Sequence, residues 1–261
     1  MNLGSANVVI RPRNTRESVD LSFPFLLQVG GRRYLRLVAI VLVPLVATCL
    51  ALKYWGSLSW AELWWFALPL GVWAQGPFTL AAGELMFTDQ LDPWRVVKTF
   101  VRRIPAYTSA LLLTRTLMGI AALTLVLFPW AWARFAFAPE ASLLEALPVS
   151  RVAGRASRLG SGQGAASFEL WLWSALTLGF AFVAAEGLGH AIVGYTLQLS
   201  SPWGDLLDEG GSLYATLGWF AAVPLLSTMR FLRYVDRRTR SDGWDVQIRF
   251  QHVVQMAEEN P

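Results

Sequence analysis

An almost unbroken apolar stretch over residues 106–147 constrains the fold of this chain more than any other feature. A membrane-crossing helix needs roughly 20 apolar residues to traverse about 30 Å of hydrocarbon, so the stretch is too long for one crossing. Pro129 lies near its middle, and proline removes a backbone hydrogen-bond donor. The helix must therefore either kink near this residue or turn back.

The composition is that of a membrane protein. Of the 261 residues, 54% are hydrophobic and only 15% are charged, whereas about 25% are charged in typical soluble domains. The chain also has 13 tryptophans, many at the ends of apolar runs, where the headgroup boundary favours their side chains. We therefore predict an all-α, polytopic membrane helical bundle that has the lipid bilayer as its first partner.

Six apolar segments predict about six transmembrane helices. They are residues 35–52, 60–87, 107–128, 130–147, 168–185 and 213–233. Two shorter amphipathic segments, residues 20–30 and 92–104, predict helices that lie in the membrane interface. Residues 1–34 are then a cytosolic head, residues 35–233 the membrane domain, and residues 234–261 a cytosolic tail.

The distribution of charge favours a turn at Pro129 over a kink. Basic residues gather in the head and in residues 89–103, 151–158 and 230–249, while residues 187–211 carry acidic charge and one histidine. Basic loops are normally cytosolic. A single crossing by residues 106–147 would put three loops on the wrong side, whereas a hairpin corrects all three. The net charge of +4 thus indicates topology, and we expect no nucleic-acid partner.

Three degenerate motifs resemble a known family. They are LFPWAWARFAFAPEASLLE at residues 127–145, RVAGRASRLGSG at residues 151–162 and LRYVDRRTRSDGWD at residues 232–245. They are similar to a broad, mostly uncharacterised family of bacterial six-helix membrane proteins that includes the membrane domain fused to some glycerophosphodiester phosphodiesterases. The resemblance implies a multi-pass protein of the bacterial inner membrane with both ends cytosolic. It implies no enzyme, because His190 and His252 cannot supply the metal-binding set of a phosphodiesterase.

Charged residues inside membrane segments are costly and usually face the bundle interior. With Pro129 as the apex and a rise of about 1.5 Å per residue, Glu140 and Glu145 come within about 5 Å of the depth of Arg115. The spacing predicts that Arg115 pairs with one of them, as a structural ion pair; a polar conduit and unpaired charges are the alternatives. The full candidate polar network is Gln75, Glu84, Arg115, Arg134, Glu140 and Glu145.

Within this set, Gln75 begins a Gln-Gly-Pro sequence that is expected to interrupt its helix. Such interruptions surround binding sites in some transporters, although a packing kink is the simpler interpretation.

The remaining polar groups predict no catalytic set and no cofactor. Glu186 and His190 lie together at the end of an apolar segment, but two ligands do not make a metal site, so a solvated loop is expected and no metal is predicted. Cys49 is the only cysteine and lies in an apolar run. We therefore expect no enzyme.

The tail has an alternating pattern, with Trp244, Val246, Ile248 and Phe250 separated by polar residues. Period-two alternation predicts a half-buried strand. A lone strand needs a sheet edge, so these residues are candidates for docking on a protein partner or a second copy; the alternative is a tail folded on its own cytosolic loops.

Two functions fit these observations. The first is a non-enzymatic membrane subunit that scaffolds or anchors an envelope or transport complex through its basic face and tail. The second is a transporter or channel-like protein for a lipid or small solute. An aqueous path lined by the candidate polar network would favour the second, and a tightly packed bundle the first.

Overall fold

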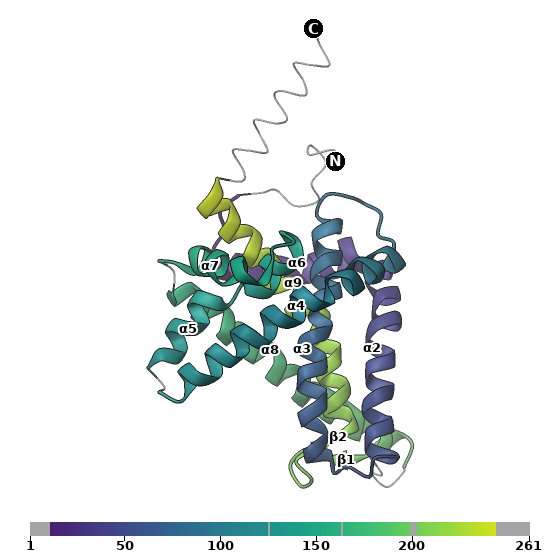
Figure 1. Ribbon diagram of the computed structural model, residues 1–261. Helices are drawn as coiled ribbons and strands as arrows, with labels where there is room; N and C mark the ends of the chain where they lie inside the picture. Colours follow the sequence, from purple (N-terminus) through teal and green to yellow (C-terminus); the bar gives the residue numbers. More distant parts are fainter. Residues whose placement is uncertain (1–10, 125, 163, 199–202, 244–261) are drawn as a thin grey trace.

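The structure is a computed structural model that describes residues 11–124, 126–162, 164–198 and 203–243, and these are mostly helical (Figure 1). The elements in chain order are α1 (Thr15–Pro24), the π-helical η2 (Phe25–Gly30), α2 (Gly31–Tyr54), α3 (Trp60–Leu85), α4 (Pro93–Ala122), α5 (Leu127–Phe135), α6 (Ala138–Leu144), α7 (Val149–Gly160), α8 (Gly164–His190), the π-helical η3 (Ala191–Thr196), β1 (Gly204–Asp205), β2 (Gly211–Ser212) and α9 (Leu213–Asp242). A helical bundle is confirmed. The predicted strand at residues 244–250 lies outside the described residues.

Three helical runs are long and apolar enough to cross a membrane: Thr15–Tyr54, Gly164–Thr196 and Leu213–Asp242. They differ in burial. In the most apolar window of the run that ends in α9, 78% of the residues are buried inside the protein, against 6% in the run that contains α8. The helix α9 is therefore the core of the bundle, and α8 offers apolar side chains to its surroundings, as a lipid-facing helix does. The other predicted crossings remain predictions.

The helix α3 begins with a capping box, in which Ser59 and Glu62 satisfy each other's backbone donors. It then runs through Pro69 and Pro77 without a break. The predicted interruption at residues 75–77 is therefore wrong. Gly76 lets the ring of Phe100 pack tightly against the helix at this point, since an added Cβ would lie 2.3 Å from that ring.

The long apolar stretch turns back, but the turn precedes Pro129. The helix α4 ends at Ala122, and Pro129 lies in the first turn of α5, where a helix tolerates proline because the first backbone donors have no partner within the helix. The helix α4 also includes the segment predicted as a separate interfacial helix.

The single return helix predicted over residues 130–147 is wrong. The chain instead forms α5 and α6 with a break at Ala136 and Phe137. Pro139 explains the break, because it lies in the first turn of a new helix, whereas in a helix interior it would disrupt the ladder.

The bundle has two distinct ends (Figure 1). At the hairpin end, β1 and β2 lie beside the start of α3 and the start of α9. At the basic end, α1, α6 and α7 lie around the second half of α9. There the side chain of Asp236, which is 1% exposed, accepts a hydrogen bond from the Arg13 backbone at 2.6 Å and pairs with Arg233 and Arg240. These contacts fix the segment before α1 to α9.

Candidate functional site

A cavity of about 210 Å³ lies where α3, α4, α5, α8 and α9 meet. Its wall has four polar side chains, Gln75, Arg115, Ser174 and Arg230, and three tryptophans, Trp132, Trp171 and Trp219. Two of the polar residues, Gln75 and Arg115, belong to the polar network predicted from the sequence.

Arg230 is held by Glu140 at this cavity. The guanidinium donates to both carboxylate oxygens, with Nε to Oε1 at 2.6 Å and Nη2 to Oε2 at 3.1 Å, and Nη2 also donates to the Ala136 carbonyl at 2.7 Å. The Glu140 side chain is only 2% exposed. A bidentate pair of this kind fixes both side chains, because the planar guanidinium matches the carboxylate. It also ties α6 to α9.

Arg115 does not pair with Glu140 or Glu145. Within the part of the chain that the structure describes, no carboxylate lies within ion-pair distance of Arg115, and its recorded contacts are the Met118 sulfur at 3.7 Å and the ring of Trp132 at 5.8 Å. The predicted pair is therefore wrong. The prediction assumed one continuous return helix, whereas α6 starts anew at Ala138 and directs Glu140 to α9.

The cavity consequently carries an excess of positive charge. Arg115 and Arg230 repel each other electrostatically, and both are attracted by Glu140. Of these three charges, the carboxylate is already bound to Arg230. The Arg115 guanidinium is thus available to an anionic ligand, and the tryptophan rings supply an apolar wall beside it.

Glu145 belongs to a different cluster, at the basic end. It accepts hydrogen bonds from the Tyr234 hydroxyl and from Arg155, whose Nε lies 2.8 Å from Oε2. Arg155 also pairs with Asp242 at the end of α9. The hydrogen bonds that Arg155 donates to Asp242 and Glu145 hold its pKa above the ordinary value despite its partial burial. This cluster joins α7 and α6 to α9.

The other two predicted residues also lie away from the cavity. Glu84 pairs with Arg95 at 3.0 Å, between the end of α3 and the start of α4. Arg134 donates to the Ser157 hydroxyl at 2.6 Å and lies over the ring of Trp130. Both make local contacts that link neighbouring helices.

Arg230 was not predicted to line the cavity, because its charge was grouped with the basic tail. A signal was present, since Arg230 lies inside the segment 213–233 that was predicted to cross the membrane. Charges within such segments usually face the bundle interior.

No family model, no curated protein and no solved structure matches this chain.

Proposed function

We propose that this chain is an integral membrane protein that binds the anionic group of a lipid or small solute in the cavity lined by Arg115 and Arg230, as a carrier or transporter of that molecule. The observation that carries the proposal is the Arg115 guanidinium, which lines the cavity without an ion-pair partner among the described carboxylates. A charge placed inside an apolar bundle is costly, so an anionic ligand that neutralises it is strongly favoured.

The size and walls of the cavity restrict the ligand. A volume of about 210 Å³ is smaller than the roughly 300–1,000 Å³ of drug-sized ligand sites. It fits a phosphate or carboxylate group with a short polar extension, and the apolar remainder of a lipid would lie outside. Arg115 supplies a planar fork of donors for the anion, and the Gln75 amide offers a further donor, whereas the Ser174 hydroxyl already donates to the Leu170 carbonyl at 2.8 Å.

The arrangement in the membrane is part of the proposal. The helices α2, α3, α8 and α9 cross, α4 and α5 enter from the basic end as a re-entrant pair, and both chain ends lie in the cytosol of a bacterium, at its inner membrane. Support comes from the clustering of arginines at the basic end, from the acidic loop at the hairpin end, and from the motif resemblance to the six-helix family. A re-entrant pair leaves the chain ends on the same side as six crossings do.

The ligand proposal is tested by replacing Arg115 with glutamine. Hydrogen bonds to a charged group contribute about 1.5–3 kcal/mol, so we expect Arg115→Gln to weaken anion binding by roughly 10- to 100-fold. Two probes separate the sources of the anion: phosphatidylglycerol retained from nanodiscs, measured by native mass spectrometry, and inorganic phosphate, measured by titration calorimetry.

Arg151→Gln is the matched control, because Arg151 is exposed on α7 and lies away from the cavity. It removes the same charge and should leave binding unchanged. Equal retention of both probes by the wild type and Arg115→Gln would refute the proposal, as would the absence of binding to the wild type.

A second candidate function is the scaffold subunit. The observation that favours it is the Arg155 cluster, which fixes the exposed arginines of α7 on a rigid basic surface. A stoichiometric protein that copurifies after gentle extraction, and is lost when the residues after Gly243 are deleted, would support this function. The deletion must spare Asp242, because that residue pairs with Arg155.

A further inference from the structure

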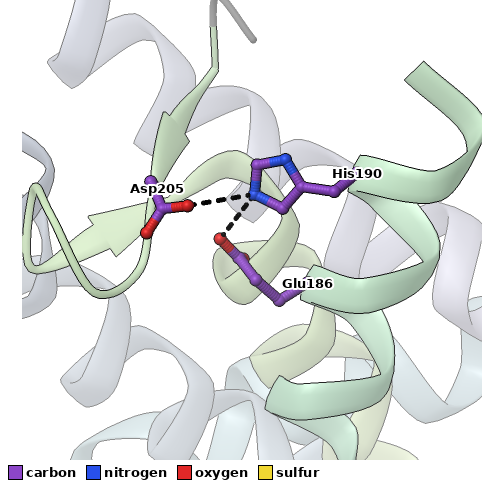
Figure 2. Close-up of side chains that lie close together, drawn as sticks. All are labelled: Glu186, His190 and Asp205. Atoms are coloured by element: carbon purple, nitrogen blue, oxygen red, sulfur yellow. Dashed lines mark hydrogen bonds and ion pairs between the residues drawn. The ribbon is translucent and has the colours of Figure 1, made fainter. Parts of the chain in front are cut away.

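Three side chains with metal-binding atoms, none of which lines the arginine cavity, meet at the hairpin end (Figure 2). Glu186 and His190 lie one turn apart on α8, and Asp205 lies on β1. The His190 Nε2 atom is 3.2 Å from Glu186 Oε1 and 3.5 Å from Asp205 Oδ2, and all three ligand atoms lie within 4.8 Å of one another. The sequence suggested only two ligands here, Glu186 and His190, and therefore a solvated loop. Asp205 is the third potential ligand.

The fold of the hairpin places Asp205 at this point. Gly204 has a φ of +76°, a conformation that L side chains rarely adopt, and an added Cβ would lie 2.5 Å from the Trp60 indole nitrogen. Glycine therefore lets β1 lie directly on the start of α3. The pairing of Asp205 with Gly211 in β2, together with the hydrogen bond from the Leu206 backbone to Glu186, then holds the strand next to the end of α8.

The side chain of Asp205 is held by one of its oxygens. Its Oδ1 accepts hydrogen bonds from the backbone N–H groups of Leu207 at 2.8 Å and Asp208 at 3.2 Å. Its other oxygen, Oδ2, is the one that faces His190. The loop thus orients the carboxylate and leaves one oxygen directed at the cluster.

Glu186 and His190 are oriented in a similar way. Glu186 Oε1 accepts a hydrogen bond from the Leu206 backbone at 2.9 Å, and Oε2 accepts one from the Ser212 hydroxyl. The His190 ring packs edge-on against Tyr214, with ring centroids 5.1 Å apart. Partners of this kind in the outer shell of a metal site set the direction of its ligands.

We propose that Glu186, His190 and Asp205 bind a divalent transition-metal ion of the Zn²⁺ class. Zn²⁺ binds imidazole nitrogen and carboxylate oxygen at about 2.0–2.2 Å, and a tetrahedron with such bonds has ligand atoms about 3.4 Å apart. The two nitrogen–oxygen distances, 3.2 and 3.5 Å, match that spacing. One imidazole among carboxylates favours Zn²⁺ over Mg²⁺ or Ca²⁺, which prefer ligand sets made entirely of oxygen.

Three protein ligands leave one tetrahedral position for a water molecule or an external ligand. The side chains of His190 and Asp205 are 33% and 40% exposed, so this position is accessible from the hairpin end. Glu186 is more enclosed, at 15%. The bound ion joins the end of α8 to the hairpin, and through it to the start of α9. It is independent of the anion proposed for the cavity.

The test measures Zn²⁺ binding to the full chain in detergent after removal of metals with a chelator. We expect one equivalent to bind to the wild type by titration calorimetry, with at least tenfold weaker binding by Asp205→Asn and His190→Gln. Co²⁺ should give a visible absorption band with the wild type that both variants lose. Zn²⁺ should also raise the thermal midpoint of the wild type, since an ion that binds the folded state stabilises it.

Asp208→Asn is the matched control. It removes the same charge from the same loop, and Asp208 contributes only its backbone N–H to the cluster. Circular dichroism of the metal-free variants checks that each one folds. Three results would overturn the proposal: no Zn²⁺ binding by the wild type, an equal loss in Asp208→Asn and Asp205→Asn, or tighter binding of Mg²⁺ than of Zn²⁺. The first two would leave His190 as a hydrogen-bonded side chain only, and the third would exclude an ion of the Zn²⁺ class.

Discussion

At the scale of single residues, the choice of partner for Glu140 determines what Arg115 can do. Glu140 binds Arg230 through two hydrogen bonds, and this contact leaves Arg115 to the cavity. The sequence allowed us to predict that Glu140 or Glu145 is ion-paired inside the bundle. It did not allow the partner to be identified, because the depth of a residue was estimated along a helix that breaks at Ala136.

A double-mutant cycle tests this choice of partner. We expect Glu140→Gln alone to lower the free energy of unfolding by about 3 kcal/mol, because it leaves the Arg230 charge buried without its partner. In the double variant with Arg230→Gln, the two losses of unfolding free energy should be non-additive. In the double variant with Arg115→Gln, they should be nearly additive. Denaturant titration in detergent measures the four free energies of each cycle. Coupling of Glu140 to Arg115 as strong as its coupling to Arg230 would contradict the assigned pair.

At the scale of elements, α7 shows what local pattern can predict. Its buried residues Val152, Ala156 and Leu159 recur at helical spacing, so its apolar face is readable from the sequence. The position at which α7 docks cannot be read from the sequence. Arg155 on this helix binds Glu145, which precedes it, and Asp242 at the end of α9, which is distant in the chain. Contacts between residues far apart in sequence leave no periodic signal.

Replacing Arg155 tests how α7 is attached. Arg155→Ala should remove the ion pairs to Glu145 and Asp242 and destabilise the docking of α7 by about 2 kcal/mol, since the side chain of Arg155 is only 13% exposed and hydrogen bonds to charged groups contribute roughly this amount. Hydrogen exchange of α7 should then become about 30-fold faster. Arg151→Ala, an exposed change on the same helix, should leave exchange unaltered. Equal protection in both variants would show that apolar packing alone holds α7.

At the scale of the whole molecule, composition and charge predicted a helical membrane bundle, and the structure confirms a bundle with three helices capable of crossing. The position of the turn after α4 was predicted to within a few residues. The path after the turn was not predicted, since Pro129 was expected to make the turn and Pro139 to lie within one helix, whereas each lies in the first turn of a separate helix. Glu186 and His190 were placed together from the sequence, but their third neighbour Asp205 was missed, because the hairpin that supplies it depends on packing against Trp60.

The depth of the α4–α5 turn decides how many times the chain crosses the membrane. The helix α5 has 9 residues, which rise about 14 Å, against about 30 Å for the hydrocarbon core. The next helix, α6, already lies at the basic end, where Leu143 accepts a hydrogen bond from Arg103. In the proposed arrangement the turn therefore stops inside the membrane, where lipid covers its exposed apolar residues, such as Val126, which is 82% exposed.

Labelling of single introduced cysteines with a membrane-impermeant maleimide tests this topology in intact cells. We expect Glu209→Cys, at the hairpin end, to be labelled from outside, Arg151→Cys, at the basic end, only after permeabilisation, and Val126→Cys under neither condition. The only native cysteine, Cys49, is buried, so the unmodified chain serves as the unlabelled control. Labelling of Val126→Cys from outside would establish that α4 and α5 cross fully and restore six crossings. Labelling of Arg151→Cys from outside would refute the orientation, because the basic end would then face away from the cytosol.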